Sequence, residues 1–199
     1  MPTVFKQVLS DSFPYANGDL HTLNANWVYD VGSFGITTNV CYATANPCLA
    51  YRADAGPFAD QYSEATVSLT VVGGTQNCGP GVRIAAGANT GYYIQLATNL
   101  TQLVRDVAGS VVVLVTTGVN FATGDVCRLA AVGNLLTVYK NGAPLAGFTN
   151  ILDTAIASGY LGQFGAGIAT SNGLTSWAGG TALVQAGGLS PGFDFGYRE

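Results

Sequence analysis

The acidic residues that could act as a catalytic pair are few in this chain. Hydrolysis of a glycosidic bond generally needs two carboxylates, one as acid and one as nucleophile or base. The sequence has only two glutamates, Glu64 and Glu199, and Asp60 is the nearest acidic neighbour of Glu64. A strand-entry aspartate and a solvated glutamate account for Asp60 and Glu64. We therefore expect no catalytic residues and a protein that is not an enzyme.

The sequence also lacks the residues that metal sites and serine nucleophiles need. His21 is the only histidine, so a histidine-rich metal site cannot form. No Gly-x-Ser-x-Gly segment marks a serine nucleophile. The four cysteines are too unevenly spaced to favour a zinc site. We expect neither a metal nor a cofactor.

The cysteines leave two alternatives open. Six residues, including Asn46-Pro47, separate Cys41 from Cys48, so a loop can fold back and close a disulfide. That candidate disulfide suits an extracellular or virion protein, whereas buried free thiols suit a cytosolic one. Cys78 and Cys127 would have to meet across a sheet.

Composition and net charge limit the kinds of partner that the protein can bind. Charged residues make up 9% of the 199 residues, against a usual value of about 25%, so either part of the surface faces another protein or uncharged polar residues solvate it. The net charge is −4 and the seven Lys and Arg are scattered, which argues against nucleic acid. No apolar run reaches the roughly 20 residues that cross a membrane, and the N-terminal segment does not resemble a secretory signal.

The elements expected to hold any site are β-strands. Short runs rich in Val, Thr, Tyr and Ile alternate with Gly, Asn, Pro and Asp about every ten residues, which is typical of an all-β sandwich or barrel. We predict one domain over residues 1–185 and a C-terminal tail or assembly arm over 186–199. The expected strands are Thr3–Ser12, Trp27–Val31, Gly35–Tyr42, Leu49–Ala53, Tyr62–Val72, Gly81–Ala86, Tyr92–Ala97, Leu100–Asp106, Ser110–Thr117, Asp125–Val132, Leu135–Lys140, Gly159–Ala166 and Ser176–Val184.

Alternation assigns faces to these strands. From Glu64 to Val71, apolar and polar residues alternate, so one face is buried and the other is wetted. The same pattern predicts outward positions for Arg83, Tyr93, Gln95 and Arg128, which would form a polar, aromatic-bearing surface suited to a glycan. We expect Trp27 and Trp177 to pack in the core.

Several segments together resemble the concanavalin-A-like lectin/glucanase (laminin-G-like) superfamily. The resemblance rests on their order along residues 10–184, and the segments are Ser10–Leu20 followed by Trp27, Asp60–Val67, Gly81–Ile84, Gly91–Ile94, Gly124–Leu129 and Leu136–Gly142. It implies an antiparallel two-sheet β-sandwich with jelly-roll topology. Such domains occur in secreted sugar-binding modules, in glycosidases and in phage virion proteins.

The resemblance also bears on metal and catalysis. Domains of this superfamily often hold calcium near the first and last strands, where Asp11 would contribute, but the closing segment Leu174–Gly180 has no acidic residue. Its glucanases resemble one another in a strand that carries Glu, Asp and Glu on one face, and nothing here matches. We therefore predict no metal-ligating residue.

The function favoured by the sequence is structural. We expect a non-enzymatic decorating subunit of an extracellular assembly, a phage capsid or tail protein, that forms a homo-oligomer or contacts other virion proteins. The glycine-containing tail would deliver Phe193, Phe195 and Tyr197 to a partner pocket. The alternative is a secreted carbohydrate-binding module. A glycoside hydrolase or lyase ranks below both.

Overall fold

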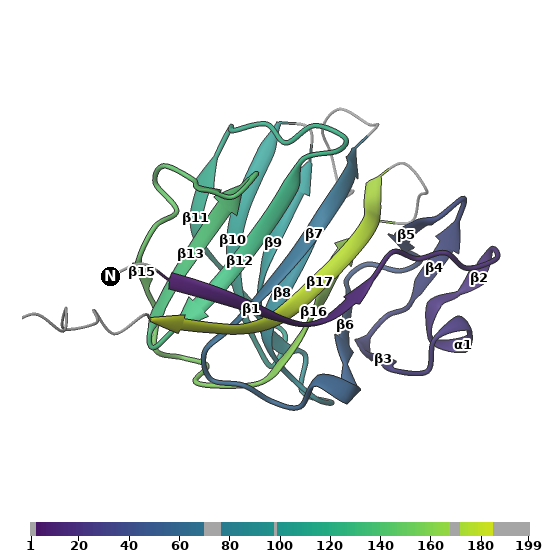
Figure 1. The fold of residues 1–199 in the computed structure, drawn as a ribbon, viewed down its shortest axis with the longest axis horizontal. Coiled ribbons are helices and arrows are strands. Elements are labelled where there is room, and N and C mark those ends of the chain that lie inside the picture. The colour runs from purple at the N-terminus through teal and green to yellow at the C-terminus, as the bar shows by residue number, and fades with distance from the viewer. Residues whose placement is uncertain (1–2, 70–76, 98, 168–171, 185–199) are drawn as a thin grey trace, which may run out of the picture.

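The protein is a sandwich of two antiparallel β-sheets (Figure 1). The computed structural model describes residues 3–69, 77–97, 99–167 and 172–184. The ten strands of the first sheet, sheet A, are β1 (Thr3–Asp11), β2 (Gly18–Asp19), β4 (Phe34–Thr37), β5 (Val40–Ala43), β7 (Gln61–Leu69), β12 (Val126–Val132), β13 (Leu135–Lys140), β14 (Ala143–Pro144), β15 (Ile151–Leu152) and β17 (Asn172–Val184). The expected all-β fold class is confirmed.

The second sheet, sheet B, is built around a meander. Its order is β11-β10-β9-β8-β16-β6-β3, so four strands consecutive in the chain lie side by side. The seven strands are β3 (Trp27–Val31), β6 (Cys48–Arg52), β8 (Asn77–Ala85), β9 (Thr90–Ala97), β10 (Leu100–Val107), β11 (Ser110–Thr117) and β16 (Tyr160–Ala166). The described helical turns are α1 (Leu20–Leu23) and η1 (Ala53–Ala55).

Turn chemistry sets much of the register. Gly133-Asn134 joins β12 to β13 as an antiparallel hairpin, with Val132 opposite Leu135. At the β10–β11 turn, Ala108 and Gly109 both have positive φ. The expected single strand Gly35–Tyr42 is instead two strands, because Thr38 and Asn39 adopt positive φ and turn the chain between β4 and β5.

The core lies between the sheets, where alternate residues of each strand meet. Tyr92, Ile94 and Leu96 of β9 belong to this inner cluster. Trp27 and Trp177 are fully buried and pack edge to face, 4.9 Å between ring centroids, so the expected core role of both tryptophans is confirmed.

The paired strands β1 and β17 form a ribbon that passes across the outer face of sheet A (Figure 1). Phe5 of β1 contacts Tyr62 of β7 and Tyr139 of β13 there, with ring centroids 5.1 and 5.4 Å apart. This ribbon covers part of sheet A and leaves the outer face of sheet B uncovered by β1 and β17. No helix among the described residues is long and apolar enough to cross a membrane.

Candidate functional site

A hollow on the outer face of sheet B is the candidate site. It encloses about 340 Å³ and is lined by Asn46, Pro47, Asn77, Tyr93, Gln95, Val111, Phe164 and Ala166. These residues come from β8, β9, β11, β16 and the loop before β6, so the meander and its neighbours bring them together. Within the described ranges, none of the lining residues is charged.

The floor of the hollow is a pair of stacked rings. Tyr93 and Phe164 lie face to face with centroids 4.0 Å apart and ring planes 2° apart. Both residues are only 2% exposed. The ring faces therefore pack against each other, and little of either ring is open to a ligand. Burial, and then the charge of Asp106, raises the pKa of the Tyr93 phenol. Tyr93 therefore stays a neutral hydroxyl at physiological pH.

Amide side chains supply the polar groups of the wall. The side-chain oxygen Oδ1 of Asn77 is buried and has no hydrogen-bond partner among the described residues. Gln95 is half-buried on the same face, one strand away. Asn46 is exposed and precedes Pro47 through a cis peptide bond. An unpaired buried acceptor costs free energy that a donor from a ligand would recover.

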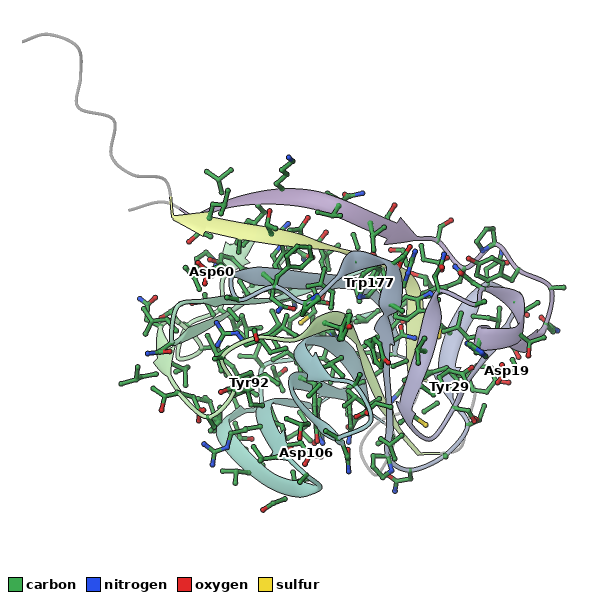
Figure 2. The ribbon with its side chains drawn as sticks, turned by 90° about the horizontal axis from the view of Figure 1, so that it is seen from below. Asp19, Tyr29, Asp60, Tyr92, Asp106 and Trp177 are labelled. Carbon is green, nitrogen blue, oxygen red and sulfur yellow. The ribbon has the colours of Figure 1, made fainter. Side chains whose placement is uncertain are left out.

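Two carboxylates lie beyond the ring pair. Asp106 of β10 is 2% exposed, and its Oδ1 has no hydrogen-bond partner in the part of the chain that the structure describes. Oδ2 of Asp30 is buried and lacks a partner there as well. Burial is the main cause that raises the pKa of Asp106, and the negative charge of Asp30 adds to it, while the Gly109 N–H opposes it. In Figure 2, Asp106 lies on the side of the molecule away from the β1–β17 ribbon, whereas Asp60 lies close beneath that ribbon.

Of the residues predicted for a glycan surface, Tyr93 and Gln95 are brought together in this hollow, but Arg83 is not. Arg83 is 1% exposed rather than outward, and it donates hydrogen bonds to the carbonyl oxygens of Ala59, Ile156 and Gly133. The reason is local: the pairing of β8 with β9 shifts between Val82 and Ala85, and Arg83 has a φ of 52°. That irregularity breaks the alternation on which the outward assignment depended.

Arg128 lies on the other sheet. It is on the outer face of sheet A, where its Nε donates to Glu64 at 2.7 Å and its guanidinium lies over the Phe5 ring at 4.2 Å. A wider groove of about 640 Å³ runs beside it, lined in part by Phe5, Thr137 and Tyr139. Arg128 therefore cannot act in one surface with Tyr93 and Gln95.

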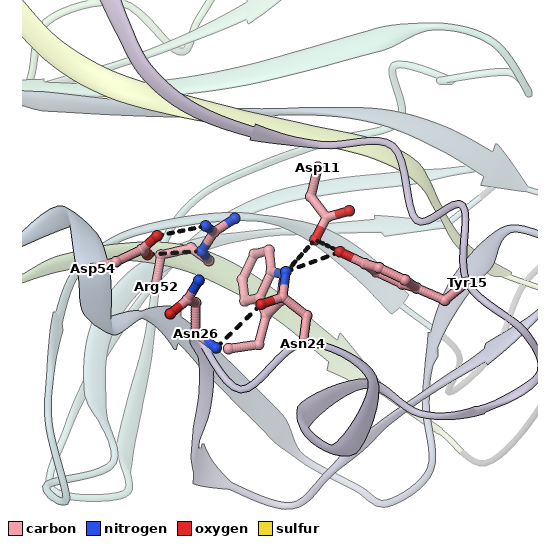
Figure 3. Close-up of polar contacts among 7 residues, drawn as sticks. Asp11, Tyr15, Asn24, Asn26, Arg52 and Asp54 are labelled. Carbon is pink, nitrogen blue, oxygen red and sulfur yellow. Dashed lines mark hydrogen bonds and ion pairs between the residues drawn. The ribbon is translucent and has the colours of Figure 1, made fainter.

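Asp11 is fully engaged by its own chain (Figure 3). Its Oδ2 accepts from Tyr15, Asn24 and the Trp27 indole, at 2.9, 3.2 and 2.8 Å, and its Oδ1 accepts from the Phe13 backbone. Nearby, Arg52 forms a two-point ion pair with Asp54. Within the described ranges, no group of three or more His, Cys, Asp or Glu is placed to hold a metal.

The expected Cys41–Cys48 disulfide is wrong, because all four thiols are free and buried. Cys41 lies on β5 in sheet A and Cys48 on β6 in sheet B. The Cys48 thiol donates to the Ser33 and Ala45 carbonyls, while Cys41 Sγ accepts from Gln163. The predicted arm residues Phe193, Phe195 and Tyr197 lie outside the described residues.

Sequence reasoning missed Asn46, Asn77 and Phe164. Asn77 follows a Gly- and Val-rich segment and carries no periodic signal, and Phe164 reads as an ordinary core residue between glycines. The one available hint was the glycine content of β8 and β16, since glycines in strands often mark close approach of other groups.

No protein-family profile matches the sequence, and no curated protein matches it. Solved structures do resemble the fold. The carbohydrate-binding module CBM66 from Bacillus subtilis matches with a TM-score of 0.58 at 12% identity, over 79% of this chain and 93% of that one.

Two further structures cover more of the chain. The exoplasmic/lumenal domain of VIP36, in its Ca²⁺/Man3GlcNAc-bound form, matches with a TM-score of 0.59 at 12% identity, over 89% of this chain and 90% of that one. LamA from Z. galactanivorans, in complex with laminaritriose and laminaritetraose, matches with a TM-score of 0.56 at 11% identity, over 88% and 99%. The chain therefore has the concanavalin-A-like, galectin-like jelly-roll fold of lectin and carbohydrate-binding domains.

Proposed function

We propose that this chain binds an uncharged glycan in the hollow on the outer face of sheet B. The observation that carries the proposal is the unpaired Asn77 Oδ1 in the wall of a hollow whose floor is aromatic. A sugar presents hydroxyl donors around its edge and C–H groups on its faces, which match the amide side chains and the exposed apolar side chain of Val111 in the wall. Ligand pockets of about 300 Å³ and upward combine apolar walls with a few polar groups in this way.

The choice of an uncharged ligand comes from the lining. Acidic sugars are usually held by Arg or Lys, and none of the described residues that line the hollow is charged. Sheet B also carries the carboxylates Asp30 and Asp106, which lie close enough to act on each other, and negative charge there would repel an acidic sugar.

The solved structures with a similar fold support glycan binding only through that shared fold. CBM66 is named as a carbohydrate-binding module, and the VIP36 domain is bound to Man3GlcNAc. Because one fold hosts many functions, these names support the proposal only together with the site.

We also propose that binding occurs without catalysis. Glu64, the sole glutamate in the predicted domain, is neutralised by Arg128 on the outer face of sheet A, and Asp60 accepts from the Gly133 backbone at 2.7 Å. These carboxylates are on the opposite sheet from the hollow.

A glycan array with neutral and acidic oligosaccharides tests the proposal. We expect the full chain to bind neutral members, and Asn77→Ala and Gln95→Ala each to weaken the best hit about tenfold, corresponding to roughly 1.4 kcal/mol. The control Gln7→Ala changes an exposed amide on β1 and should leave binding unchanged. An array without hits, or hits that survive both site variants, would refute the assignment.

A second candidate is a structural subunit of an extracellular assembly such as a phage virion. It is favoured by a cluster of exposed valines on β10 and β11, together with the 9% charged content. We propose a virion or extracellular location together with this role. The cysteines do not support it, because free thiols give no reason to expect an oxidising compartment. Light scattering on the purified chain separates a subunit that assembles into large particles from a binding module that stays a monomer or a dimer.

A further inference from the structure

Four valines are exposed at the tip of the β10–β11 hairpin. Val107 is 40% exposed, and Val111, Val112 and Val113 are 54%, 38% and 46% exposed. The three consecutive valines lie in β11, so their side chains point alternately to the two faces of sheet B. A monomer gains nothing from exposing both faces of an apolar strand.

β11 is also the terminal strand of sheet B, and its outward edge pairs with no other strand in the described ranges. Such an edge offers a row of backbone N–H and C=O groups to another strand. From Val107 to Gly124 the sequence contains no charged residue. Neither backbone nor side chains of this segment therefore discourage pairing.

The other described sheet edges each carry a protective feature, and the edge strands β2 and β15 are only two residues long. β1 has the exposed Lys6 and a register shift between Gln7 and Leu9. β3 has Asp30 at a register shift, and β14 is two residues long and ends in Pro144. Charges, bulges, prolines and short length are the devices that keep edge strands from pairing. β11 has a bulge only at Leu114, beyond the three valines.

We propose that β11 pairs antiparallel with β11 of a second copy of this chain, about a twofold axis at Val112. The segment Val111-Val112-Val113 reads the same in both directions, so this pairing places valine opposite valine at all three positions. Symmetric dimers require such a self-complementary patch. The absence of charge means that no like charges meet across the axis.

The dimer would join two seven-stranded sheets into one continuous sheet. Because Val111 also lines the hollow described above, the two hollows would lie on the same face, near the seam. Two linked sites raise the effective affinity for a repeating ligand. The dimer itself does not depend on what the hollow binds.

The first test is the solution mass of three proteins by analytical ultracentrifugation. We expect the wild type at twice the 20.4 kDa of one chain, and Val112→Glu at the monomer mass because two glutamates would then face each other across the axis. Arg105 is opposite Val112 on β10, so the variant remains compatible with folding, which circular dichroism checks. The matched control Val8→Glu, on an equally exposed valine of the β1 edge, should stay a dimer.

A cross-link tests the register. Val112→Cys should form a covalent dimer on mild oxidation, whereas Val8→Cys should not, since the four native thiols are buried. A monomeric wild type, a Val112→Glu dimer, a Val8→Glu monomer, or a wild-type dimer whose Val112→Cys form does not cross-link would each overturn the proposal.

Discussion

Tyr93 of β9 and Phe164 of β16 stack face to face across the strand that separates them, β8, with ring centroids 4.0 Å apart. They can meet because β8 has Gly81 opposite Tyr93 and Gly79 opposite Phe164. A Cβ at Gly79 would meet the backbone carbonyl of Ile94, and one at Gly81 would crowd the Ile84 side chain, so neither position has room for a side chain.

The first prediction follows from this arrangement. Gly81→Val should destabilise the protein by about 1–3 kcal/mol, because its branched side chain adds volume to a filled region. A Cβ at Gly81 already lies 3.2 Å from Ile84 Cδ1. Urea unfolding measures the change. Gly118→Val, where a Cβ would meet nothing within 4 Å, should stay within about 0.5 kcal/mol of wild type.

Arg83 should behave as a structural residue. Arg83→Met should lower the free energy of unfolding by roughly 3 kcal/mol, since three backbone carbonyls from separate loops lose a charged donor. Thermal and urea unfolding check this, with Lys6→Met as a surface control. If Arg83→Met is as stable as wild type and only glycan binding is lost, the structural assignment fails.

Asp106 should contribute to the free energy of unfolding at acidic pH, where its carboxyl group is protonated. Its folded pKa is raised above the ordinary value of 3.8, so the folded state holds the proton more tightly than the unfolded state. The stabilisation from this group is complete below pH 3.8 and is lost as the pH rises through the folded pKa.

Asp106→Asn removes the buried charge and should stabilise the protein at pH 7 by on the order of 1 kcal/mol, with the gain shrinking below pH 3.8. Urea unfolding at both pH values measures it. Asp54→Asn is the opposing control, because it deprives the buried Arg52 of its ion-pair partner and should destabilise at pH 7. An Asp106→Asn gain that is the same at both pH values would contradict the proposed cause.

The thiols should be inert until the protein unfolds. Burial raises the pKa of the Cys78 thiol to about 12, and Cys41, Cys48 and Cys127 are buried as well. A chromogenic thiol reagent should therefore titrate none of the four in the native state and all four in denaturant, without prior reduction. Two reactive thiols in denaturant would instead indicate one disulfide.

The sequence by itself determined the class of fold and most of its strands. β11 and β13 have the predicted bounds, Ser110–Thr117 and Leu135–Lys140, and the Gly133-Asn134 turn joins the strands it was expected to join. These features are local: alternation with period two and residues that accept positive φ are properties of a few neighbours in the chain.

Only the tertiary structure decided which residues share a surface. Arg83 and Arg128 follow the same alternation as Tyr93 and Gln95, yet a register shift buries Arg83 and the sheet assignment puts Arg128 on the other face of the sandwich. The spacing of Cys41 and Cys48 permitted a disulfide, but the chain crosses from one sheet to the other between them. Phe164 joins Tyr93 only because β16 inserts beside β8, a pairing over some 80 residues that local patterns cannot specify, since it is fixed by the packing of the whole core.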